Sequence, residues 1–242
     1  MAKLTKDESK KHKQVMDMVH SDKPLSFDDK LFIIEHYQES NGQLNSLAGA
    51  FFTPWGLARD FAIEVPGEAS IVDLCAGIGG LSFAALTMRN PSSITCIELN
   101  ADYIEVGKRV VPEATWIQGD ALQFCETMGA RLFDVAISNP PFGKIRTSEV
   151  NSLSYTGGDF EYKLIESAMK IAGLGVFIIP QMSAPFKYSG ERMYTALKDG
   201  KFKKFTDQTG IVMQPNCGID TAYYKNEWKG VSPICEIVIC EV

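Results

Sequence analysis

The sequence of 242 residues lacks several features that define other classes of protein. It has no apolar run near the ~20 residues that a membrane-spanning helix needs, and its first residues are too polar for a secretory signal. It also has no internal repeat and no collagen-like or low-complexity stretch. We therefore expect a soluble, globular, cytoplasmic protein with no membrane partner.

Closely spaced metal ligands are lacking as well. The six cysteines form no Cys-x-x-Cys pair, and the three histidines all lie within the first 40 residues, away from the cysteines. Zinc sites are normally built from such pairs, so we expect no metal cofactor. Cys75, Cys96 and Cys240 fall in apolar runs, where cysteine behaves as a small hydrophobic residue, and we expect free thiols.

An excess of positive charge is also absent, because the formal net charge is −6. The protein as a whole therefore does not attract nucleic acid, although a local basic cleft is compatible with this composition. The basic residues gather in an early cluster and a late one. These clusters are Lys3, Lys6, Lys10, Lys11 and Lys13, and Lys198, Lys201, Lys203 and Lys204. A solvated surface is the usual role of such clusters.

What the sequence does have, after residue 70, is an alternation of short apolar runs and helix-length segments. The runs cover 70–76, 93–99, 114–119, 133–139 and 175–180, and the helical segments lie near 80–89, 101–111, 120–128 and 160–172. This alternation is typical of a parallel sheet covered on both faces. Two further strands, at 218–224 and 234–242, would add an antiparallel hairpin. We predict a doubly wound, Rossmann-like α/β fold with a seven-stranded, mostly parallel sheet.

The chain before this alternation is expected to be organised differently. We predict a polar, mobile tail over 1–24, a helical segment over 25–66 and the α/β domain over 67–242. Within the helical segment, Ser26 is placed to cap a helix that Asn41-Gly42 would end. Thr53 and Pro54 are suited to start a second helix over about 53–63, because threonine caps and proline fits the first helical position.

Four motifs follow consecutive predicted strands. They are Asp73-Leu-Cys-Ala76-Gly77-Ile-Gly79-Gly80, then Glu98, then Asp120-Ala121, and finally Asn139-Pro140-Pro141-Phe142. A glycine-rich turn before a helix lets a ligand approach the backbone closely, but by itself it indicates only a nucleotide-like ligand. Open α/β sheets bind ligands at the carboxyl ends of their strands, where all four motifs should meet. An acid after the second strand is suited to bind a ribose diol.

With these motifs, the chain resembles the class I S-adenosylmethionine (SAM)-dependent methyltransferases that methylate amino groups, over roughly residues 49–242. The resemblance implies a SAM-binding domain over 67–242 in which the first three motifs contact the cofactor. The residues so implied are Asp73, Ala76, Gly77 and Gly79 in the loop, Glu98 at the ribose, and Asp120 and Ala121 at the adenine. Phe52-Thr53-Pro54 is similar to the Phe-x-Thr-Pro segment of N6-adenine DNA methyltransferases, which implies contact with the methionine end of SAM, as for Asn139.

The resemblance also implies that Asn139, Pro140, Pro141 and Phe142 carry the catalysis. An exocyclic amino nitrogen is a poor nucleophile, because its lone pair is delocalised into the base. Carbonyl oxygens of the Asn139 side chain and the Pro140 main chain could accept both amino hydrogens and stabilise the developing positive charge. The two prolines would stiffen the loop, and Phe142 would stack on a base turned out of its helix.

The motif does not by itself name the substrate. Phe52-Thr53-Pro54 favours N6 of adenine in DNA, so nucleic acid is the expected partner. Only 100 residues follow Phe142, too few for the separate target-recognition domain of the larger DNA enzymes, and this keeps adenine N6 or guanine N2 of RNA open. Protein glutamine N5 and a non-catalytic SAM-binding subunit are further alternatives. Loops 143–159 and 181–216 combine basic and aromatic residues and are the expected contacts for phosphates and bases.

Overall fold

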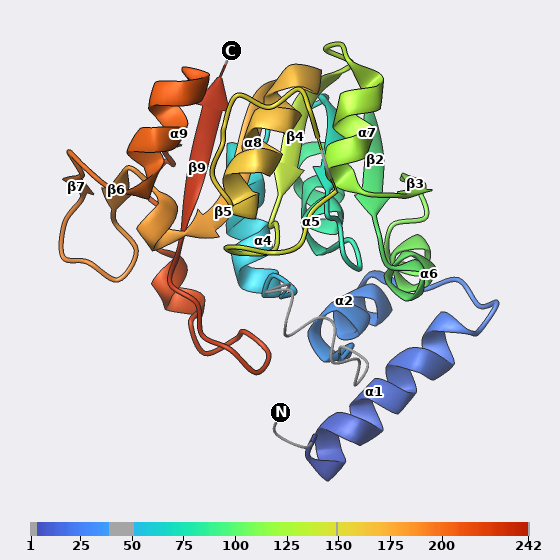
Figure 1. Cartoon of the computed structure of the whole chain (residues 1–242). Helices are drawn as coiled ribbons and strands as arrows, with labels where there is room; N and C mark the ends of the chain where they lie inside the picture. The colour runs from blue at the N-terminus through green and yellow to red at the C-terminus, as the bar shows by residue number, and fades with distance from the viewer. Residues whose placement is uncertain (1–3, 39–50, 149, 242) are drawn as a thin grey trace.

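The computed structural model describes residues 4–38, 51–148 and 150–241. Its body is a seven-stranded sheet in the order β3-β2-β1-β4-β5-β9-β8 (Figure 1). These strands are β1 (Ser70–Leu74), β2 (Ser93–Glu98), β3 (Thr115–Gln118), β4 (Phe133–Ser138), β5 (Ala172–Pro180), β8 (Gln214–Pro215) and β9 (Cys235–Glu241). Strands β1 to β5 pair in parallel, and β9 pairs antiparallel with β5 and β8. The predicted α/β fold is confirmed.

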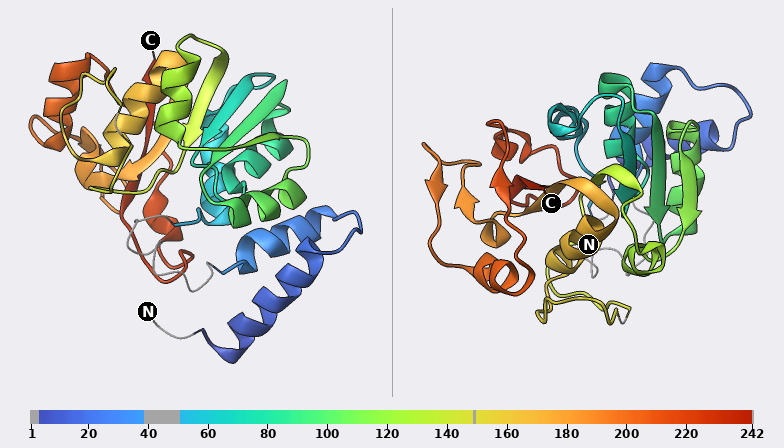
Figure 2. Two further views of the ribbon diagram at one scale, coloured as in Figure 1. Left: turned by 45° about the vertical axis from the view of Figure 1, so that its right-hand side comes forward. Right: turned by 90° about the horizontal axis from the view of Figure 1, so that it is seen from above.

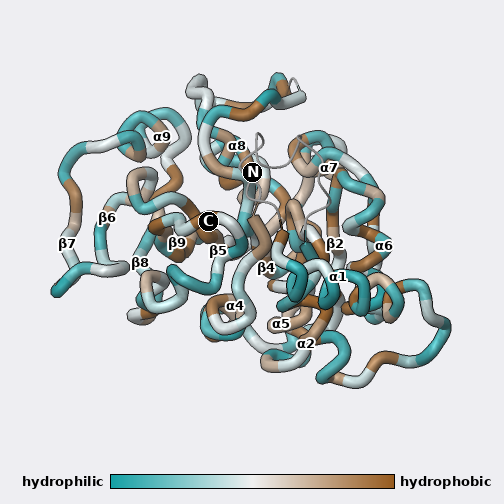
Figure 3. Tube along the Cα trace, turned by 90° about the horizontal axis from the view of Figure 1, so that it is seen from below, coloured by the Kyte–Doolittle hydropathy of each residue, from teal (hydrophilic) through white to brown (hydrophobic). Residues whose placement is uncertain are grey.

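Helices cover both faces of this sheet, as the alternation of strands and helices predicted. One layer holds α7 (Ala121–Met128), α8 (Phe160–Ile171) and α9 (Lys201–Thr209); the other holds α4 (Trp55–Phe61), α5 (Gly80–Arg89) and α6 (Ala101–Val110). Successive side chains of a strand point to opposite faces, so Val72 and Leu74 of β1 pack toward α7 and α8, whereas Ile71 packs toward α4 and α5. Hydrophobic stretches accordingly run along the central strands (Figure 3).

The structure corrects the expectation of a mobile tail over 1–24. Helix α1 (Lys6–Val19) begins at a capping box in which Thr5 and Glu8 satisfy each other's backbone N–H groups. Its Val15 and Val19 are buried in a cluster shared with α6 and with α2 (Phe27–His36). Figure 2 shows α1 and α2 at the opposite end of the molecule from α9 and the small sheet of β6 (Phe186–Lys187) and β7 (Thr195–Ala196).

The helix starts between 25 and 66 are confirmed in part. Ser26 caps α2 through a capping box with Asp29, as predicted. The predicted end at Asn41-Gly42 lies outside the described residues. The second helix begins later than predicted, because Pro54 is its N-cap and Thr53 makes no cap hydrogen bond; after α4 the chain forms the short 3₁₀ helix η1 (Ala62–Glu64).

The predicted strand at 218–224 was wrong. Asp220 accepts a hydrogen bond from the N–H of Ala222 and starts the 3₁₀ helix η3 (Thr221–Tyr224). The edge of the antiparallel pair is instead β8, which precedes the predicted strand, while the predicted strand at 234–242 is present as β9. Among the described residues, no helix has the length and apolarity that crossing a membrane requires.

Candidate active site

A cavity of about 830 Å³ lies at the carboxyl ends of β1, β2 and β4. It lies where the strand order reverses between β1 and β4, which is where open α/β sheets bind ligands. Most of the predicted site residues line it. These are Phe52, Thr53, Asp73, Ala76, Gly77, Glu98, Asp120, Ala121, Asn139 and Pro141. The fold thus brings together predicted site residues that are spread over 90 positions of the chain.

The glycine loop between β1 and α5 forms the floor of this cavity. Gly77 and Gly79 have φ angles of +56° and +84°, and Cys75 adopts +60°, so the chain turns through the left-handed region three times. Gly79 is the N-cap of α5. A Cβ atom on Gly77 would lie 3.2 Å from the Phe52 ring. The loop therefore needs glycine at Gly77 for both its backbone conformation and its contact with Phe52.

Two buried carboxylates flank this loop. Glu98 accepts hydrogen bonds from the N–H groups of Gly77 (2.7 Å) and Asn100 (2.8 Å), which ties the end of β2 to the loop. Burial raises the pKa of Glu98, against the lowering effect of these N–H groups. Asp73 is 1% exposed and accepts a hydrogen bond from Ser82 Oγ (2.6 Å). Burial, assisted by the charge of Glu98, raises the pKa of Asp73 to about 7.

Asp120 serves first as a helix cap in this structure. Its Oδ1 accepts the N–H groups of Leu122 and Gln123 at the start of α7, and its Oδ2 accepts Ser148 Oγ (2.9 Å). The bond from Ser148 ties the loop after β4 to this wall of the cavity. Asp120 and Ala121 remain our expected contacts for an adenine ring.

Asn139 is held by the segment that precedes α4. Its Nδ2 donates to the carbonyl oxygen of Phe51 and to Thr53 Oγ1, both at 2.9 Å. Because the carbonyl oxygen of Phe51 can only accept, its bond fixes which end of the amide is nitrogen and which is oxygen, and Thr53 Oγ1 accepts from the same nitrogen. The remaining atom, Oδ1, is buried and has no hydrogen-bond partner among the described residues. A buried acceptor without a donor is costly, and a ligand's N–H group would relieve that cost.

The remaining predicted residues do not line the cavity. Phe142 is half-buried against the hydrophobic cluster of α4, α5 and the sheet. Pro54 lines a smaller neighbouring pocket, and Gly79 lies against Trp116 and Val111. Pro140 connects Asn139 to the cavity residue Pro141.

Sequence reasoning missed part of the cavity wall. The segment Lys144–Thr147 lines the cavity, although its two cations were expected only as phosphate contacts. Ile34 and Tyr103 line it too, and because they come from the N-terminal helices and from α6, no local motif could have indicated them. Cys75 is also a wall residue; burial raises the pKa of its thiol well above the usual value, so it is a poor nucleophile.

The lysines of the late cluster are less available to bind phosphates than the sequence indicated. Lys201 forms an ion pair with Asp159 (3.1 Å), and Lys203 forms one with Asp207 (3.1 Å). Lys204 lies over the Tyr155 ring, 5.8 Å from its centroid. By contrast, Lys144 and Arg146 are exposed at the cavity and pair with no other described residue. The described residues hold no group of three or more His, Cys, Asp or Glu side chains that could bind a metal.

The residues present fit SAM in size and chemistry. The cavity volume of about 830 Å³ is ample for a nucleoside-sized ligand. Asp73 Oδ1 is a second buried oxygen without a partner among the described residues, so it could accept a donor from a ligand. Glu98 lies at the end of β2, where an acid can bind a ribose diol, and it remains our expected ribose contact.

Residues 59–154, less than half of the chain, match the profile of the family described as "Methyltransferase small domain". The comparison with curated proteins gave no match. Among solved structures, the chain is similar to one described as "a putative RNA methyltransferase PH1948 from Pyrococcus horikoshii". The TM-score is 0.56 and the identity 16%, over 89% of this chain and 98% of that one.

Two further structures are less similar. Thermoplasma acidophilum 1320 has a TM-score of 0.47 and 16% identity, over 76% of this chain and 87% of that one. TrmN from Thermus thermophilus has a TM-score of 0.46 and 9% identity, over 77% of this chain and 48% of that one. At these identities the likenesses concern the fold alone. The family match, the fold and the fit of the cavity together support a class I methyltransferase with SAM as its cofactor.

Proposed function

We propose that the protein transfers the methyl group of SAM to an exocyclic amino nitrogen, N6 of adenine in DNA. The observation that carries the proposal is the orientation of Asn139. Its amide nitrogen is engaged by Phe51 and Thr53, so its carbonyl oxygen is the end left for a substrate. An acceptor in this position suits an amino group, which brings N–H donors.

The proposed chemistry needs acceptors rather than a nucleophilic side chain. Bound SAM would supply an electrophilic methyl group, and the amino nitrogen would form the new N–C bond as the S–C bond breaks. Asn139 Oδ1 and the carbonyl oxygen of Pro140 would accept the amino hydrogens and stabilise positive charge on the nitrogen. Neither oxygen is a base at neutral pH, so the displaced proton would pass to water. Phe142 is half-buried, and its exposed part would stack on the base.

Two features favour nucleic acid over a protein substrate. Lys144 and Arg146 stand at the cavity that holds Asn139, without other described partners, where they could meet the phosphates on either side of a flipped nucleotide. Thr53 of the Phe52-Thr53-Pro54 element, together with the neighbouring Phe51, holds the Asn139 amide in the orientation that amino methylation requires. Because that element is similar to the one in N6-adenine DNA methyltransferases, DNA is the first candidate.

RNA is the second candidate substrate. The structure similar to this chain over 89% of its length is described as that of a putative RNA methyltransferase. The described residues, moreover, form no separate target-recognition unit beside the α/β fold. Adenine N6 and guanine N2 are both amino groups that the same acceptors could bind.

The test is transfer of tritiated methyl groups from SAM to duplex DNA, single-stranded DNA, RNA and protein in parallel, followed by mass spectrometry of the nucleosides. We expect N6-methyladenine in DNA. Asn139→Ala should lower turnover by about 10²-fold, as when one transition-state acceptor is removed, and leave SAM affinity nearly intact by calorimetry. Label found only in RNA would favour the second candidate, and label in glutamine would contradict both.

A further inference from the structure

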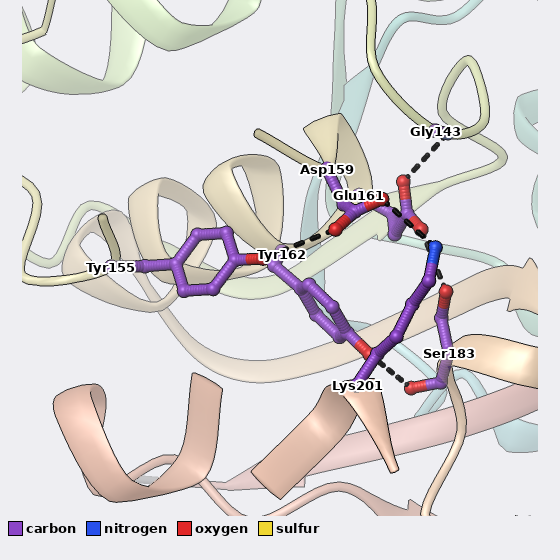
Figure 4. Close-up of polar contacts among 7 residues, drawn as sticks. All are labelled: Gly143, Tyr155, Asp159, Glu161, Tyr162, Ser183 and Lys201. Atoms are coloured by element: carbon purple, nitrogen blue, oxygen red, sulfur yellow. Dashed lines mark hydrogen bonds and ion pairs between the residues drawn. The ribbon is translucent and has the colours of Figure 1, made fainter. Parts of the chain in front are cut away.

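A buried carboxylate on α8 contacts the loop that follows Phe142 (Figure 4). Glu161 is 1% exposed, and its Oε2 accepts the N–H of Gly143 (2.9 Å). Its Oε1 accepts the hydroxyl of Ser183 (2.7 Å), in the 3₁₀ helix η2 (Gln181–Ser183) that follows β5. One side chain therefore joins the turns that leave two neighbouring strands of the sheet.

The peptide groups on both sides of Gly143 are fixed by the start of α8. While its N–H donates to Glu161, its carbonyl oxygen accepts the N–H of Phe160 (2.8 Å). Gly143 has a φ angle of +80°, a conformation that favours glycine. Glu161 lies in the first turn of α8, where a carboxylate also interacts favourably with the helix dipole. The anchor is thus a rigid helix end rather than a flexible loop.

This anchor lies four residues from Asn139, and two of the intervening residues are prolines. Because proline fixes φ, the segment from Asn139 to Gly143 has little freedom to absorb a displacement at one end. Phe51 and Thr53 hold the first end, and Glu161 holds the second. Beyond Gly143 the chain continues into the cavity wall at Lys144. The position of Glu161 therefore affects both the proposed acceptor oxygens of the Asn139 loop and the cavity wall at Lys144.

We propose that Glu161 is a positioning residue for methyl transfer: through Gly143 it holds the Asn139–Phe142 loop in the geometry that meets the amino group. This inference rests on the proposed function of that loop. Glu161 touches neither the substrate nor the cofactor in this scheme. Its loss should therefore lower turnover and leave SAM affinity intact, because the Glu98 contacts that tie the glycine loop do not involve α8.

A second carboxylate on the same helix provides a matched control. Glu166 is 5% exposed and accepts the N–H groups of Ser154 (2.6 Å) and Tyr155 (2.9 Å), in a more distant part of the same loop. Glu166→Ala removes an equally buried carboxylate with two backbone partners and does not touch Gly143. A merely structural role for Glu161 predicts the same turnover for the two alanine variants at a temperature where both are folded.

The experiment compares Glu161→Ala, Glu161→Gln and Glu166→Ala in turnover, SAM affinity and thermal unfolding. We expect turnover of Glu161→Ala to fall at least 10-fold with SAM affinity within about twofold of the wild type, and Glu166→Ala to keep near wild-type turnover. Glutamine should restore most of the activity, since its oxygen can accept from Gly143 and its amide can donate to Ser183 Oγ. If Glu161→Ala does not fold, Glu161→Asp, which keeps the charge but shortens the reach, replaces it.

Equal turnover in Glu161→Ala and Glu166→Ala, or an unchanged turnover in Glu161→Ala, would overturn the positioning role. The comparison can use whichever acceptor the wild type methylates, so label in protein would refute the proposed function without removing this test. If the wild type methylates nothing, hydrogen exchange over residues 138–147 decides. Exchange should be faster in Glu161→Ala than in both the wild type and Glu166→Ala, and equal exchange would refute the anchor.

Discussion

Asn139 and Thr53 lie 86 positions apart in the sequence, yet one hydrogen bond joins their side chains. This bond and the one to Phe51 join the Phe-Thr-Pro element and its neighbour Phe51 to the Asn-Pro-Pro-Phe element. The first element orients the amide of the second. Thr53 also lines the cavity but caps no helix, so its hydroxyl is left to serve Asn139.

Replacing Thr53 tests this orientation. Thr53→Val keeps the shape but removes the hydroxyl that accepts from Asn139 Nδ2, so the amide would retain only its bond to Phe51. We expect turnover to fall by roughly 10-fold, equivalent to the ~1.4 kcal/mol of one ordinary hydrogen bond. Thr53→Ser keeps the hydroxyl and should retain most of the activity. Equal activity of the two variants, measured under saturating SAM, would contradict the orienting role.

Glu98 should dominate cofactor binding among the residues at the end of β2. Glu98→Ala removes a charged acceptor for the ribose and releases the N–H groups of Gly77 and Asn100. We expect SAM binding to weaken by roughly 1.5–3 kcal/mol in calorimetry. Asp102→Ala, at an exposed position early in α6, is the control and should bind SAM normally. Unchanged affinity in Glu98→Ala would show that the cofactor binds elsewhere.

Asp73 should make the stability of the cofactor-free protein depend on pH. Burial raises its pKa from 3.8 to about 7, so the folded state favours the protonated form. The stabilising contribution is therefore complete below about pH 4 and is lost as the pH rises to about 7. Asp73→Asn removes this loss, and we expect it to melt several degrees above the wild type at pH 8. The difference should shrink at pH 5, and an equal difference at both pH values would refute the assignment.

At the scale of elements, the sequence predicted the sheet well because buried parallel strands are continuously apolar. The runs at 70–76 and 133–139 match β1 and β4 within two residues at each end. It failed at α1, whose exposed face is so polar that only Val15 and Val19 are buried. The pattern Thr5-x-x-Glu8, a capping box, was the available signal for that helix.

The site, like the fold, was predictable only where it follows from the strands. Residues at the carboxyl ends of strands, such as Asp73 and Glu98, could be located once the strands were known. Ile34 and the segment Lys144–Thr147 could not, because their place in the wall depends on how separate elements pack. Thr53 was read as a helix cap because its local sequence suits one, whereas its partner is distant.

If α1 belongs to the cooperative fold, a change in its buried face should destabilise the whole protein. Val15 is fully buried, and Val15→Ala removes two methyl groups, which should cost about 2 kcal/mol. We expect a single thermal transition with its midpoint lowered by about 4–8 °C. Lys13→Ala, at an exposed position of the same helix, should leave the midpoint unchanged. A mobile segment at 1–24 predicts no shift for either variant.

At the scale of the whole molecule, the net charge of −6 must be reconciled with the nucleic-acid substrate that we propose. General attraction is excluded, so phosphates must meet local positive charge. The structure changes where that charge is expected. Lys201 and Lys203 are engaged in ion pairs, whereas Lys144 and Arg146 stand at the cavity without described partners. Phosphate contacts should therefore form at the cavity rather than along α9.

Neutralising the two cavity cations should weaken nucleic-acid binding for all sequences alike. Contacts to phosphates position the protein on the nucleic acid but do not read its base sequence. For Lys144→Gln with Arg146→Gln, we expect the slope of log affinity against log salt to flatten. The change should be up to about 0.9 per lost contact on duplex DNA or about 0.7 on single strands. Lys203→Gln with Lys204→Gln removes the same charge from α9 and should leave the slope unchanged, and SAM affinity should not change in either variant. If only the α9 variant flattens the slope, the phosphates bind along α9; if neither does, the proposed phosphate contacts at the cavity are refuted.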